Sequence, residues 1–187
     1  MGNFFQYKKS NQSKPTNEKY ANKNNVIVNK FYKIVLVGDR SVGKSSFVTK
    51  IVNDDFSLEI RPTIGIENSV KKIDNITLQF WDKSSRTKYK TINEIYYKNS
   101  KIVILMFSLE NRQTFENLDY WIDEIMSHKS LSKIILVGTH SDTNQNEINF
   151  KDIEKLKNKL NCEYFSTSAI NGDGYENILN YILEITK

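Results

Sequence analysis

The sequence predicts an α/β fold, in which a mainly parallel sheet has helices on both faces. Three observations lead to this prediction. Apolar strand-like runs alternate with helix-like segments along most of the chain, a glycine-containing pattern joins the first strand to the first helix, and a tight turn separates one pair of strands. The chain has 187 residues, which suits one domain with a tail.

Residues 1–30 are expected to form a flexible tail, and residues 31–187 the domain. The tail is rich in Asn, Lys and Ser and shows no strand or helix period before Val26. It holds six lysines against one acidic residue, Glu18, whereas the rest of the chain holds 21 basic and 21 acidic residues. Because a neutral domain lacks a basic face for nucleic acid, no nucleic-acid partner is expected.

Three features favour a reducing, cytoplasmic location. The longest apolar run, 102–107, is far shorter than the roughly 20 residues that span a bilayer. The N-terminus lacks the apolar segment of a secretory signal. The single cysteine, Cys162, cannot form a disulfide within the chain.

The alternation of periods predicts the elements in order. A buried strand is expected at 31–37 and a helix at about 45–52. Asp74-Asn75 separates two strand-like runs and favours an antiparallel hairpin. The other strands are expected at 66–73, 76–81, 102–107, 133–137 and 163–165. The other helices are expected at 92–98, 112–128, 150–160 and 175–185.

The most specific pattern runs from Gly38 to Ser45 and reads G-D-R-S-V-G-K-S. It fits G-x-x-x-x-G-K-[ST] and lies between a strand and a helix, which predicts a phosphate-binding loop. Glycines let backbone N–H groups turn toward phosphate oxygens, and the next helix presents its positive end. Lys44 is expected to neutralise phosphates, and the Ser45 hydroxyl to bind Mg²⁺. The alternative is a simple turn before an exposed lysine.

Further motifs follow in a fixed order. They are RPTIGIE at 61–67, LQFWD at 78–82, YYKNSKIVILMFSLENRQTFENL at 96–118, ILVGTHSD at 135–142 and FSTSA at 165–169. With the phosphate loop, they resemble the motifs of small GTPases of the Ras superfamily, the Rab branch in particular, over about residues 31–186. The resemblance implies the P-loop small GTPase fold, with a six-stranded sheet and five helices. It also implies bound GTP or GDP, and switch segments that the γ-phosphate orders.

The resemblance assigns the phosphate loop to the nucleotide and three side chains to Mg²⁺. The loop residues are Asp39, Arg40, Ser41, Val42, Gly43, Lys44, Ser45 and Ser46. Thr63 stands where the family has the threonine of its first switch, so its hydroxyl would join Ser45 on the metal. Asp82 ends a strand beside the loop, where a carboxylate suits the outer shell of the metal. Taken alone, Thr63 could mark a turn, and Asp82 a solvated acid.

Residues 138–142 follow a strand and resemble the family's guanine loop, N/T-K-x-D. Asp142 can accept hydrogen bonds that guanine offers and adenine cannot, which favours GTP over ATP. Thr139 takes the first position. His140 replaces the usual lysine, where it would stack on the base or be an ordinary loop histidine.

A second base loop is expected at Ser168-Ala169-Ile170, which resembles the family's S-A-K. In the family, the alanine N–H meets the guanine oxygen, and this backbone donor is kept here. Ile170 departs at the third place and changes only the packing. The two altered loops predict guanine binding with weakened affinity.

The second switch segment departs further from the family. Where the family reads W-D-T-A-G-Q-E, this chain reads W-D-K-S-S-R-T. Ser85 replaces the glycine that contacts the γ-phosphate, and Arg86 replaces the glutamine that orients the attacking water. Because arginine cannot accept a hydrogen bond from water, slow hydrolysis is expected. The expected catalytic residues are Lys44, Thr63, Ser85 and Arg86. Arg40 would crowd an incoming arginine finger; alternatively, Arg86 or Arg40 acts as a finger in cis.

Effector, exchange-factor and activating proteins are expected to bind the switch regions, 53–68 and 82–98. Rab proteins use a Phe, Trp and Tyr triad there, whose places hold Asn68, Trp81 and Tyr96 in this chain. One aromatic anchor is missing, so ordinary Rab effectors are expected to bind poorly. Alternatively, Trp81 and Tyr96 only pack beneath the switches.

Membrane attachment is expected to differ from that of Rab proteins. The sequence stops at 185–187 without their prenylated cysteines. The start, MGNFFQYKK, partly resembles a myristoylation signal and the Arf branch, although Gln6 stands where Ser or Thr is preferred. An acyl chain on Gly2, with Phe4, Phe5 and the tail lysines, would give peripheral contact with the cytosolic face of a membrane. The alternative is an unmodified, soluble tail.

The sequence therefore predicts a Rab-like guanine-nucleotide switch in vesicle trafficking or signalling, with slow GTP hydrolysis. The alternative is a pseudo-GTPase that holds nucleotide structurally, or none, and acts as a protein-interaction scaffold. A nucleotide kinase on the same phosphate loop is a weaker reading, because the threonine segment and the base loop follow the GTPase order.

Overall fold

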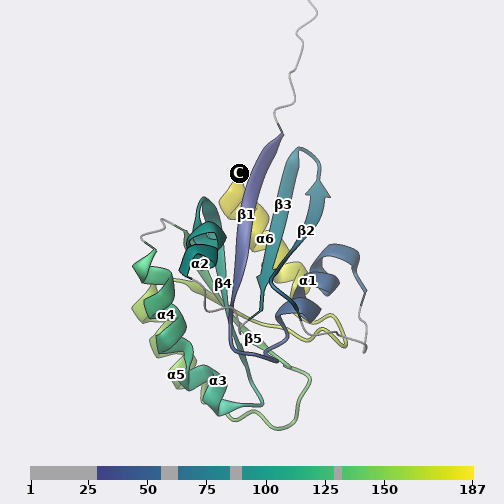
Figure 1. The fold of residues 1–187 in the computed structure, drawn as a ribbon. Helices are drawn as coiled ribbons and strands as arrows, with labels where there is room; N and C mark the ends of the chain where they lie inside the picture. Colours follow the sequence, from purple (N-terminus) through teal and green to yellow (C-terminus); the bar gives the residue numbers. More distant parts are fainter. Residues whose placement is uncertain (1–28, 56–62, 85–89, 129–131) are drawn as a thin grey trace, which may run out of the picture.

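A computed structural model describes residues 29–55, 63–84, 90–128 and 132–187, to which all structural statements refer (Figure 1). Its strands are β1 (Lys30–Gly38), β2 (Ile66–Ile73), β3 (Ile76–Lys83), β4 (Ser100–Ser108), β5 (Lys133–Thr139) and β6 (Glu163–Ser166). They form one sheet in the order β2-β3-β1-β4-β5-β6. β2 is antiparallel to β3, and all other neighbours are parallel.

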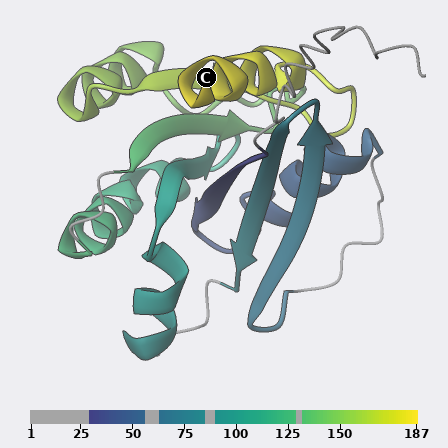
Figure 2. The same ribbon diagram turned by 90° about the horizontal axis from the view of Figure 1, so that it is seen from above.

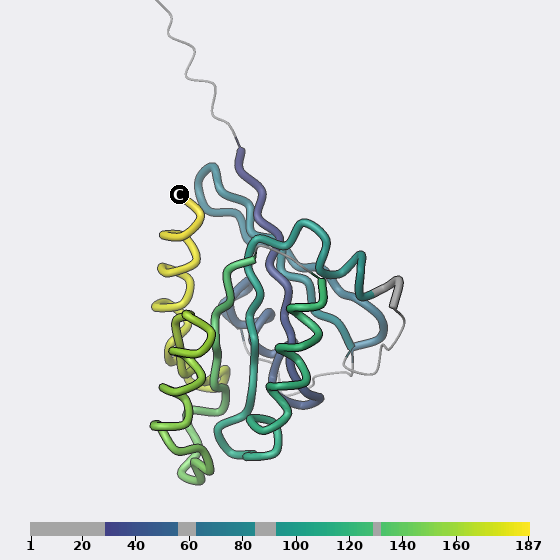
Figure 3. The backbone as a smooth tube through the Cα atoms, turned by 90° about the vertical axis from the view of Figure 1, so that its left-hand side faces the viewer, coloured from purple at the N-terminus to yellow at the C-terminus, as the bar shows by residue number. Residues whose placement is uncertain are grey.

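Helices cover both faces of this sheet. They are α1 (Lys44–Asn53), α2 (Lys90–Tyr97), α3 (Arg112–Glu116), α4 (Leu118–Ser127), α5 (Phe150–Leu160) and α6 (Tyr175–Thr186). Successive side chains of a strand point to opposite faces. In β1, Ile34 and Leu36 therefore pack with α1 and α6, whereas Val35 and Val37 pack with α2, α4 and α5. Figure 2 shows the layers from above, and Figure 3 shows α6 and α4 on opposite sides of the strands.

The predicted fold is confirmed, including the antiparallel pair and its tight turn. Asp74 in that turn has a φ of 50°, a left-handed conformation that Asp tolerates in hairpins. One expected helix is corrected: 112–128 is two consecutive helices, α3 and α4, which meet at Asn117. The ψ of Asn117 is −5°, far from the helical value of about −42°.

One end of the sheet carries the loops that follow the strands, and the other end carries the start of β1 and the end of α6. The loops after β1, β3, β4, β5 and β6 all lie at the carboxyl end of the parallel strands, where α/β folds place their ligands. At the other end, the Lys30 ammonium donates to the Lys187 carbonyl at 3.0 Å, and the Tyr32 hydroxyl donates to the Thr186 carbonyl. The start of β1 and the end of α6 therefore lie together, away from the loops.

Of the predicted tail, residues 1–30, residues 1–28 lie outside the described residues, and Lys30 already belongs to β1. In the described ranges, no helix combines the length and the apolar character that crossing a bilayer requires.

Candidate functional site

The phosphate-loop pattern occupies the turn from β1 into α1. Gly38 has a φ of 148°, and a Cβ on it would lie 2.2 Å from the Met106 carbonyl oxygen, so only glycine fits. Gly43, at a φ of 80°, caps the N-terminus of α1. Between them, Ser41 adopts a φ of 62° without being glycine. The loop therefore passes close to β4 and turns its backbone sharply before α1 begins.

Lys44 begins α1 and folds back over this loop. Its ammonium donates to the Gly38 carbonyl at 2.9 Å and to the Asp39 carbonyl at 2.5 Å. The side chain is 8% exposed. Burial lowers the pKa of Lys44 to about 8, although the nearby carboxylates of Asp82 and Asp39 oppose this shift. An anion beside this ammonium would stabilise its charged form.

Ser45, Thr63 and Asp82 converge from three different segments. The Ser45 hydroxyl donates to Asp82 Oδ2 at 2.5 Å and lies 3.0 Å from the Thr63 hydroxyl. The Thr63 hydroxyl also donates to Asp82 Oδ2, at 3.1 Å. Asp82 Oδ1 is buried and finds no hydrogen-bond partner in the described ranges. Two hydroxyls and a carboxylate are hard oxygen donors of the kind that Mg²⁺ takes, so these side chains fit that ion.

Thr139 ties the end of β5 to the phosphate loop. Its hydroxyl proton is shared between the Val42 carbonyl at 3.0 Å and the Phe107 carbonyl at 3.1 Å. The residue is only 5% exposed. The first base loop therefore begins at a fixed position beside the phosphate loop.

His140 follows in a left-handed conformation, at a φ of 59°. Its Nδ1 lies 2.9 Å from the Ser108 hydroxyl, 3.3 Å from the Thr139 hydroxyl and 3.7 Å from Glu110 Oε1. Its Cε1 lies 3.9 Å from the place of a Cβ on Gly43. The ring therefore stands beside the phosphate loop, held by β4.

The two predicted base loops lie side by side. The Ser141 N–H donates to the Thr167 carbonyl at 3.1 Å, and the Thr167 N–H donates to the Gly138 carbonyl at 2.8 Å. Asp142 is exposed, and its carboxylate makes no bond to any described residue. The loops thus leave this carboxylate available to a ligand.

In the second loop, Ser168 is fully buried and closes a turn. Its N–H donates to the Asp173 carbonyl at 3.1 Å, and its carbonyl accepts from the Gly172 N–H at 2.9 Å. Ala169 packs against the core, while the Ile170 side chain is 62% exposed. These three residues directly follow Thr167, whose backbone bonds to Gly138 and Ser141, so the second loop lies next to the first.

Asp39 and Arg40 point in different directions from the phosphate loop. The Asp39 carboxylate accepts from Asn117 Nδ2 at 2.6 Å and from Trp121 Nε1 at 2.7 Å. Arg40 is exposed and makes no hydrogen bond or ion pair to the described part of the chain. Sequence reasoning missed Asn117 and Trp121, because one continuous helix was expected over 112–128 and no local signal links either residue to Asp39.

The residues of the predicted aromatic triad do not form an exposed aromatic surface. Tyr96 is 0% exposed, and its hydroxyl lies 2.7 Å from the Leu36 carbonyl and 2.6 Å from the Trp81 carbonyl. Trp81 is partly buried, with the Lys33 ammonium 3.9 Å from its ring centroid. Tyr96 is therefore a buried packing residue, as the alternative expected of it, whereas Trp81 is only partly buried. Ser85 and Arg86 lie outside the described residues.

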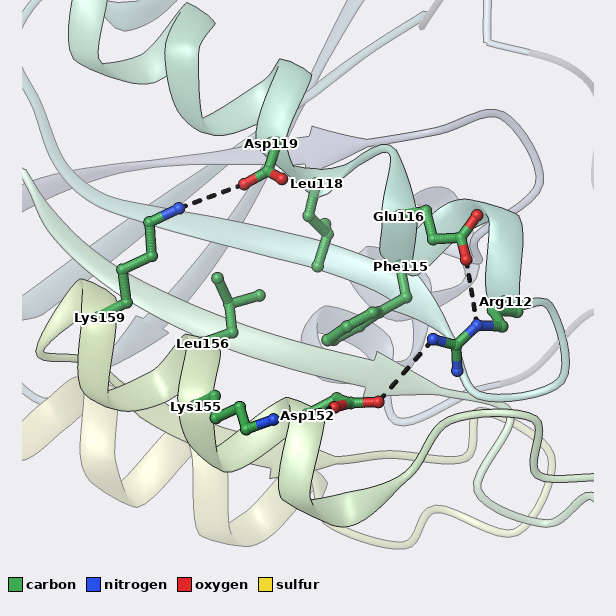
Figure 4. A pocket seen from close by; sticks show the side chains of 9 residues that line it. All are labelled: Arg112, Phe115, Glu116, Leu118, Asp119, Asp152, Lys155, Leu156 and Lys159. Atoms are coloured by element: carbon green, nitrogen blue, oxygen red, sulfur yellow. Dashed lines mark hydrogen bonds and ion pairs between the residues drawn. The ribbon is translucent and has the colours of Figure 1, made fainter.

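Two hollows lie elsewhere on the described surface. One, of about 400 Å³, lies between α3, α4 and α5, where Arg112 pairs with Glu116 and Asp152, and Lys159 with Asp119 (Figure 4). The other, of about 520 Å³, lies behind the base loops. It is lined by Ser141, Tyr164, Phe165, Ser166, Asp173, Gly174 and Asn177. Neither contains the residues that converge around Lys44.

Comparison with known proteins gives one consistent result. A sequence profile described as the Ras family matches residues 33–187. Ras-related protein RABA4b of Arabidopsis thaliana is 30% identical over 158 residues, which are 81% of this chain and 70% of that protein. Ras-related protein RabC of Dictyostelium discoideum is 29% identical over 161 residues, 82% of each chain. Ras-related protein Rab11A of Lotus japonicus is 29% identical over 165 residues, 85% of this chain and 73% of that protein.

A glycine-bounded loop between β1 and α1, a buried lysine and a hydroxyl-carboxylate cluster together define the class of P-loop nucleotide-binding domains. Within this class, the matched profile covers nearly the whole domain. The chain belongs to the Ras family, and it is a small GTPase that is similar to Rab proteins.

Proposed function

We propose that this chain binds GTP and GDP with Mg²⁺ and acts as a Rab-like switch in vesicle trafficking, with slow hydrolysis. The observation that carries the proposal is the convergence of Ser45, Thr63 and Asp82 beside Lys44. Among the described residues, Asp82 Oδ1 has no hydrogen-bond partner, so this acceptor remains free for one more interaction. The three relatives named above are all called Ras-related proteins, which supports a guanine-nucleotide switch of the same class.

Each residue of the cluster has a distinct role in this proposal. Lys44 binds the β- and γ-phosphates, and backbone N–H groups of residues 39–46 surround them. Ser45 and Thr63 would hold Mg²⁺ through their hydroxyls. The Asp82 carboxylate would serve in the outer shell of the metal. When bound, Mg²⁺ neutralises negative charge on the phosphate oxygens.

The two base loops select guanine. Asp142 accepts hydrogen bonds from the N1 and the exocyclic amine of the base, and the Ala169 N–H meets its oxygen. Thr139 positions the first loop, as its two hydrogen bonds to neighbouring carbonyls support. His140 covers one side of the site in place of lysine, and Ser168 and Ile170 frame the second loop.

Hydrolysis is proposed to be slow because the second switch lacks two groups. Ser85 replaces a glycine, and Arg86 offers only donors where a water-orienting acceptor is needed. Arg40 stands exposed at the phosphate loop and would obstruct an arginine from an activating protein. Arg86→Gln should raise turnover in a single-turnover assay; a fall would instead support an arginine finger in cis.

The same substitutions favour a second candidate, a pseudo-GTPase scaffold. In that case nucleotide, if bound, is never hydrolysed, and the chain serves other proteins as a fixed surface. In both cases partners are proposed to bind the regions 53–68 and 82–98, and the basic tail to contact a membrane surface peripherally.

Identifying the nucleotide that copurifies with the chain tests the proposal. The protein is purified with Mg²⁺, denatured, and its released nucleotide is separated by chromatography. Stoichiometric GTP supports binding with failed hydrolysis, and GDP supports a working hydrolase. Lys44→Ala should lose the nucleotide, whereas Lys101→Ala, which removes an exposed lysine at the start of β4, should keep it. No nucleotide from the unsubstituted chain, even after incubation with GTP, would leave only the scaffold.

A further inference from the structure

Lys83 is a charged side chain in the interior of the protein. It ends β3, directly after Asp82, and is only 4% exposed. Its ammonium donates to Asn93 Oδ1 at 2.7 Å and to Glu124 Oε1 at 3.1 Å. The neighbours that surround this ammonium, here called the Lys83 cage, are Asn93, Tyr96, Tyr97 and Glu124.

Both buried charges, the Lys83 ammonium and the Glu124 carboxylate, have partners within the cage. Glu124 is 12% exposed, and its Oε1 accepts from the Tyr97 hydroxyl at 2.9 Å as well as from Lys83. The Lys83 ammonium lies 5.0 Å from the Tyr96 ring centroid and 5.7 Å from that of Tyr97, which favours a cation over these rings. Removing one partner would leave the other charge buried and unpaired, which proteins rarely tolerate.

The cage joins three elements at the second switch region. Lys83 lies near the start of that region on β3, Asn93 and Tyr97 lie in the middle and at the end of α2, and Glu124 belongs to α4. Both ends of the region 82–98 are thus attached to each other and to α4. The family motif that this segment resembles reads W-D-T, whereas this chain reads W-D-K. A threonine hydroxyl in place of the Lys83 ammonium would be too short to reach Glu124 in this way.

Helix α4 also holds the phosphate loop, one turn before it holds Lys83. Trp121, three residues before Glu124, donates to the Asp39 carboxylate at 2.7 Å. Residues three apart lie on one side of a helix, so a single face of α4 supports both the loop and the second switch. The Lys83 charge is also among those that lower the pKa of Lys44, which places the cage within electrostatic reach of the phosphate site.

We propose that Lys83 is a positioning residue that holds α2 on α4 whichever nucleotide is bound. The proposal rests on the proposed function, because it concerns how a nucleotide switch reports its state. With α2 held, the first switch segment around Thr63 carries the difference between the GDP and GTP forms. Partners that distinguish the two forms therefore contact that segment, and partners that bind α2 do not distinguish them.

Hydrogen exchange of the full chain, loaded with GDP or with a non-hydrolysable GTP analogue, tests this proposal. In the unsubstituted protein, the α2 amides should differ by less than about twofold in protection between the two forms. In Lys83→Thr, and separately in Glu124→Gln, the same amides should differ by about tenfold or more. Lys133→Thr removes an exposed lysine at the start of β5 and should behave like the unsubstituted protein.

Two results with the nucleotide-loaded proteins would overturn the proposal. One is a large nucleotide-dependent change in α2 of the unsubstituted protein. The other is an α2 that stays equally protected in both forms of Lys83→Thr and Glu124→Gln. If Lys83→Thr does not fold, Glu124→Gln alone decides, because it keeps the size of the side chain and removes its charge.

Failure of the proposed function can be distinguished from failure of the Lys83 proposal by measuring nucleotide binding. A fluorescent GDP titration first measures nucleotide binding by each protein. If the unsubstituted chain binds no nucleotide, the proposed function fails, but the cage still requires strongly protected α2 amides in that nucleotide-free protein. Unprotected amides there would overturn the Lys83 proposal as well.

Discussion

The two oxygens of the Asp82 carboxylate are in different surroundings. Oδ2 accepts from both Ser45 and Thr63, whereas Oδ1 is buried without a hydrogen-bond partner in the described part of the chain. An unsatisfied buried acceptor costs about 1–3 kcal/mol. A cation with its waters is the ligand that would offset this cost.

Asp82→Asn tests that reading, because it keeps the shape and removes the charge. Nucleotide release in Mg²⁺ should become about 10- to 100-fold faster, while release in a chelator should change little. Stopped-flow dissociation of a fluorescent GDP measures both rates. Asp74→Asn, in the exposed hairpin turn, is the control. An unchanged rate in Mg²⁺ would remove Asp82 from the metal site.

The lowered pKa of Lys44 predicts that the stability of the nucleotide-free protein depends on pH. Burial lowers the pKa of Lys44 to about 8 in the folded chain, against about 10.5 when unfolded. Between these values the unfolded chain binds the proton and the folded chain does not, so stability rises with pH in this window. From pH 8 to 10.5, the free energy of unfolding should gain up to about 3 kcal/mol relative to Lys44→Met.

Urea denaturation of both proteins between pH 7.5 and 10 measures this difference. The comparison with Lys44→Met cancels the titration of the other lysines. A difference that stays flat, or that falls as pH rises, would show that Lys44 keeps its proton in the folded state.

The junction of β1 and α1 shows how one element constrains another. A Cβ on Gly38 would lie 2.2 Å from the Met106 carbonyl oxygen in β4, whereas Gly65, at a φ of 75°, has nothing within 4 Å of that place. Gly38→Ala therefore combines backbone strain with a clash, and Gly65→Ala brings strain alone. We expect a loss of more than about 3 kcal/mol for Gly38→Ala and about 1 kcal/mol for Gly65→Ala. Chemical denaturation measures both, and equal losses would contradict the close approach to β4.

Helix α4 holds the phosphate loop through Trp121. Trp121→Phe keeps an aromatic ring but leaves the Asp39 carboxylate without one of its two donors. We expect a loss of about 1–3 kcal/mol in stability and faster nucleotide release. Trp81→Phe is a matched control, since Trp81 Nε1 has no hydrogen-bond partner in the described ranges and its loss should cost little. The same loss in both variants would assign the effect to ring packing.

Most of this architecture could be predicted from the sequence, because strand and helix periods are local. The phosphate-loop pattern is local for the same reason, and Thr63, Asp82 and the base loops were predicted from short motifs that resemble those of a family. Contacts between distant positions could not be predicted in this way. Lys83 and Glu124 are 41 residues apart in the sequence, and Asp39 and Trp121 are 82 residues apart. Such pairs depend on how the elements pack, which no local pattern contains.

For the whole molecule, charge is divided between a basic tail and a neutral domain. Lysines near an anionic membrane contribute about 1 kcal/mol each, and salt screens this attraction. Sedimentation with phosphatidylserine-containing vesicles should therefore recover the full chain at low salt and much less at high salt. Replacing five tail lysines by Gln should abolish this binding: Lys8, Lys9, Lys14, Lys19 and Lys23.

The control makes the same change of charge on the domain. It replaces the exposed lysines Lys72, Lys98, Lys101, Lys133 and Lys155 by Gln and should leave vesicle binding intact. If both variants lose binding equally, net charge and not the tail is responsible. In Gly2→Ala, weaker binding would indicate that an acyl chain also contributes.

The hydrogen bond between Lys30 and Lys187 has a consequence for how such a molecule can be tethered. It brings the start of β1 beside the end of α6, while β1 itself runs to the phosphate loop, roughly 26 Å further on. A tether on either Lys30 or Lys187 would hold the domain at the end of the sheet opposite the phosphate loop. A pull applied to either segment would therefore load the same end of the sheet and leave the loops at the other end unstressed.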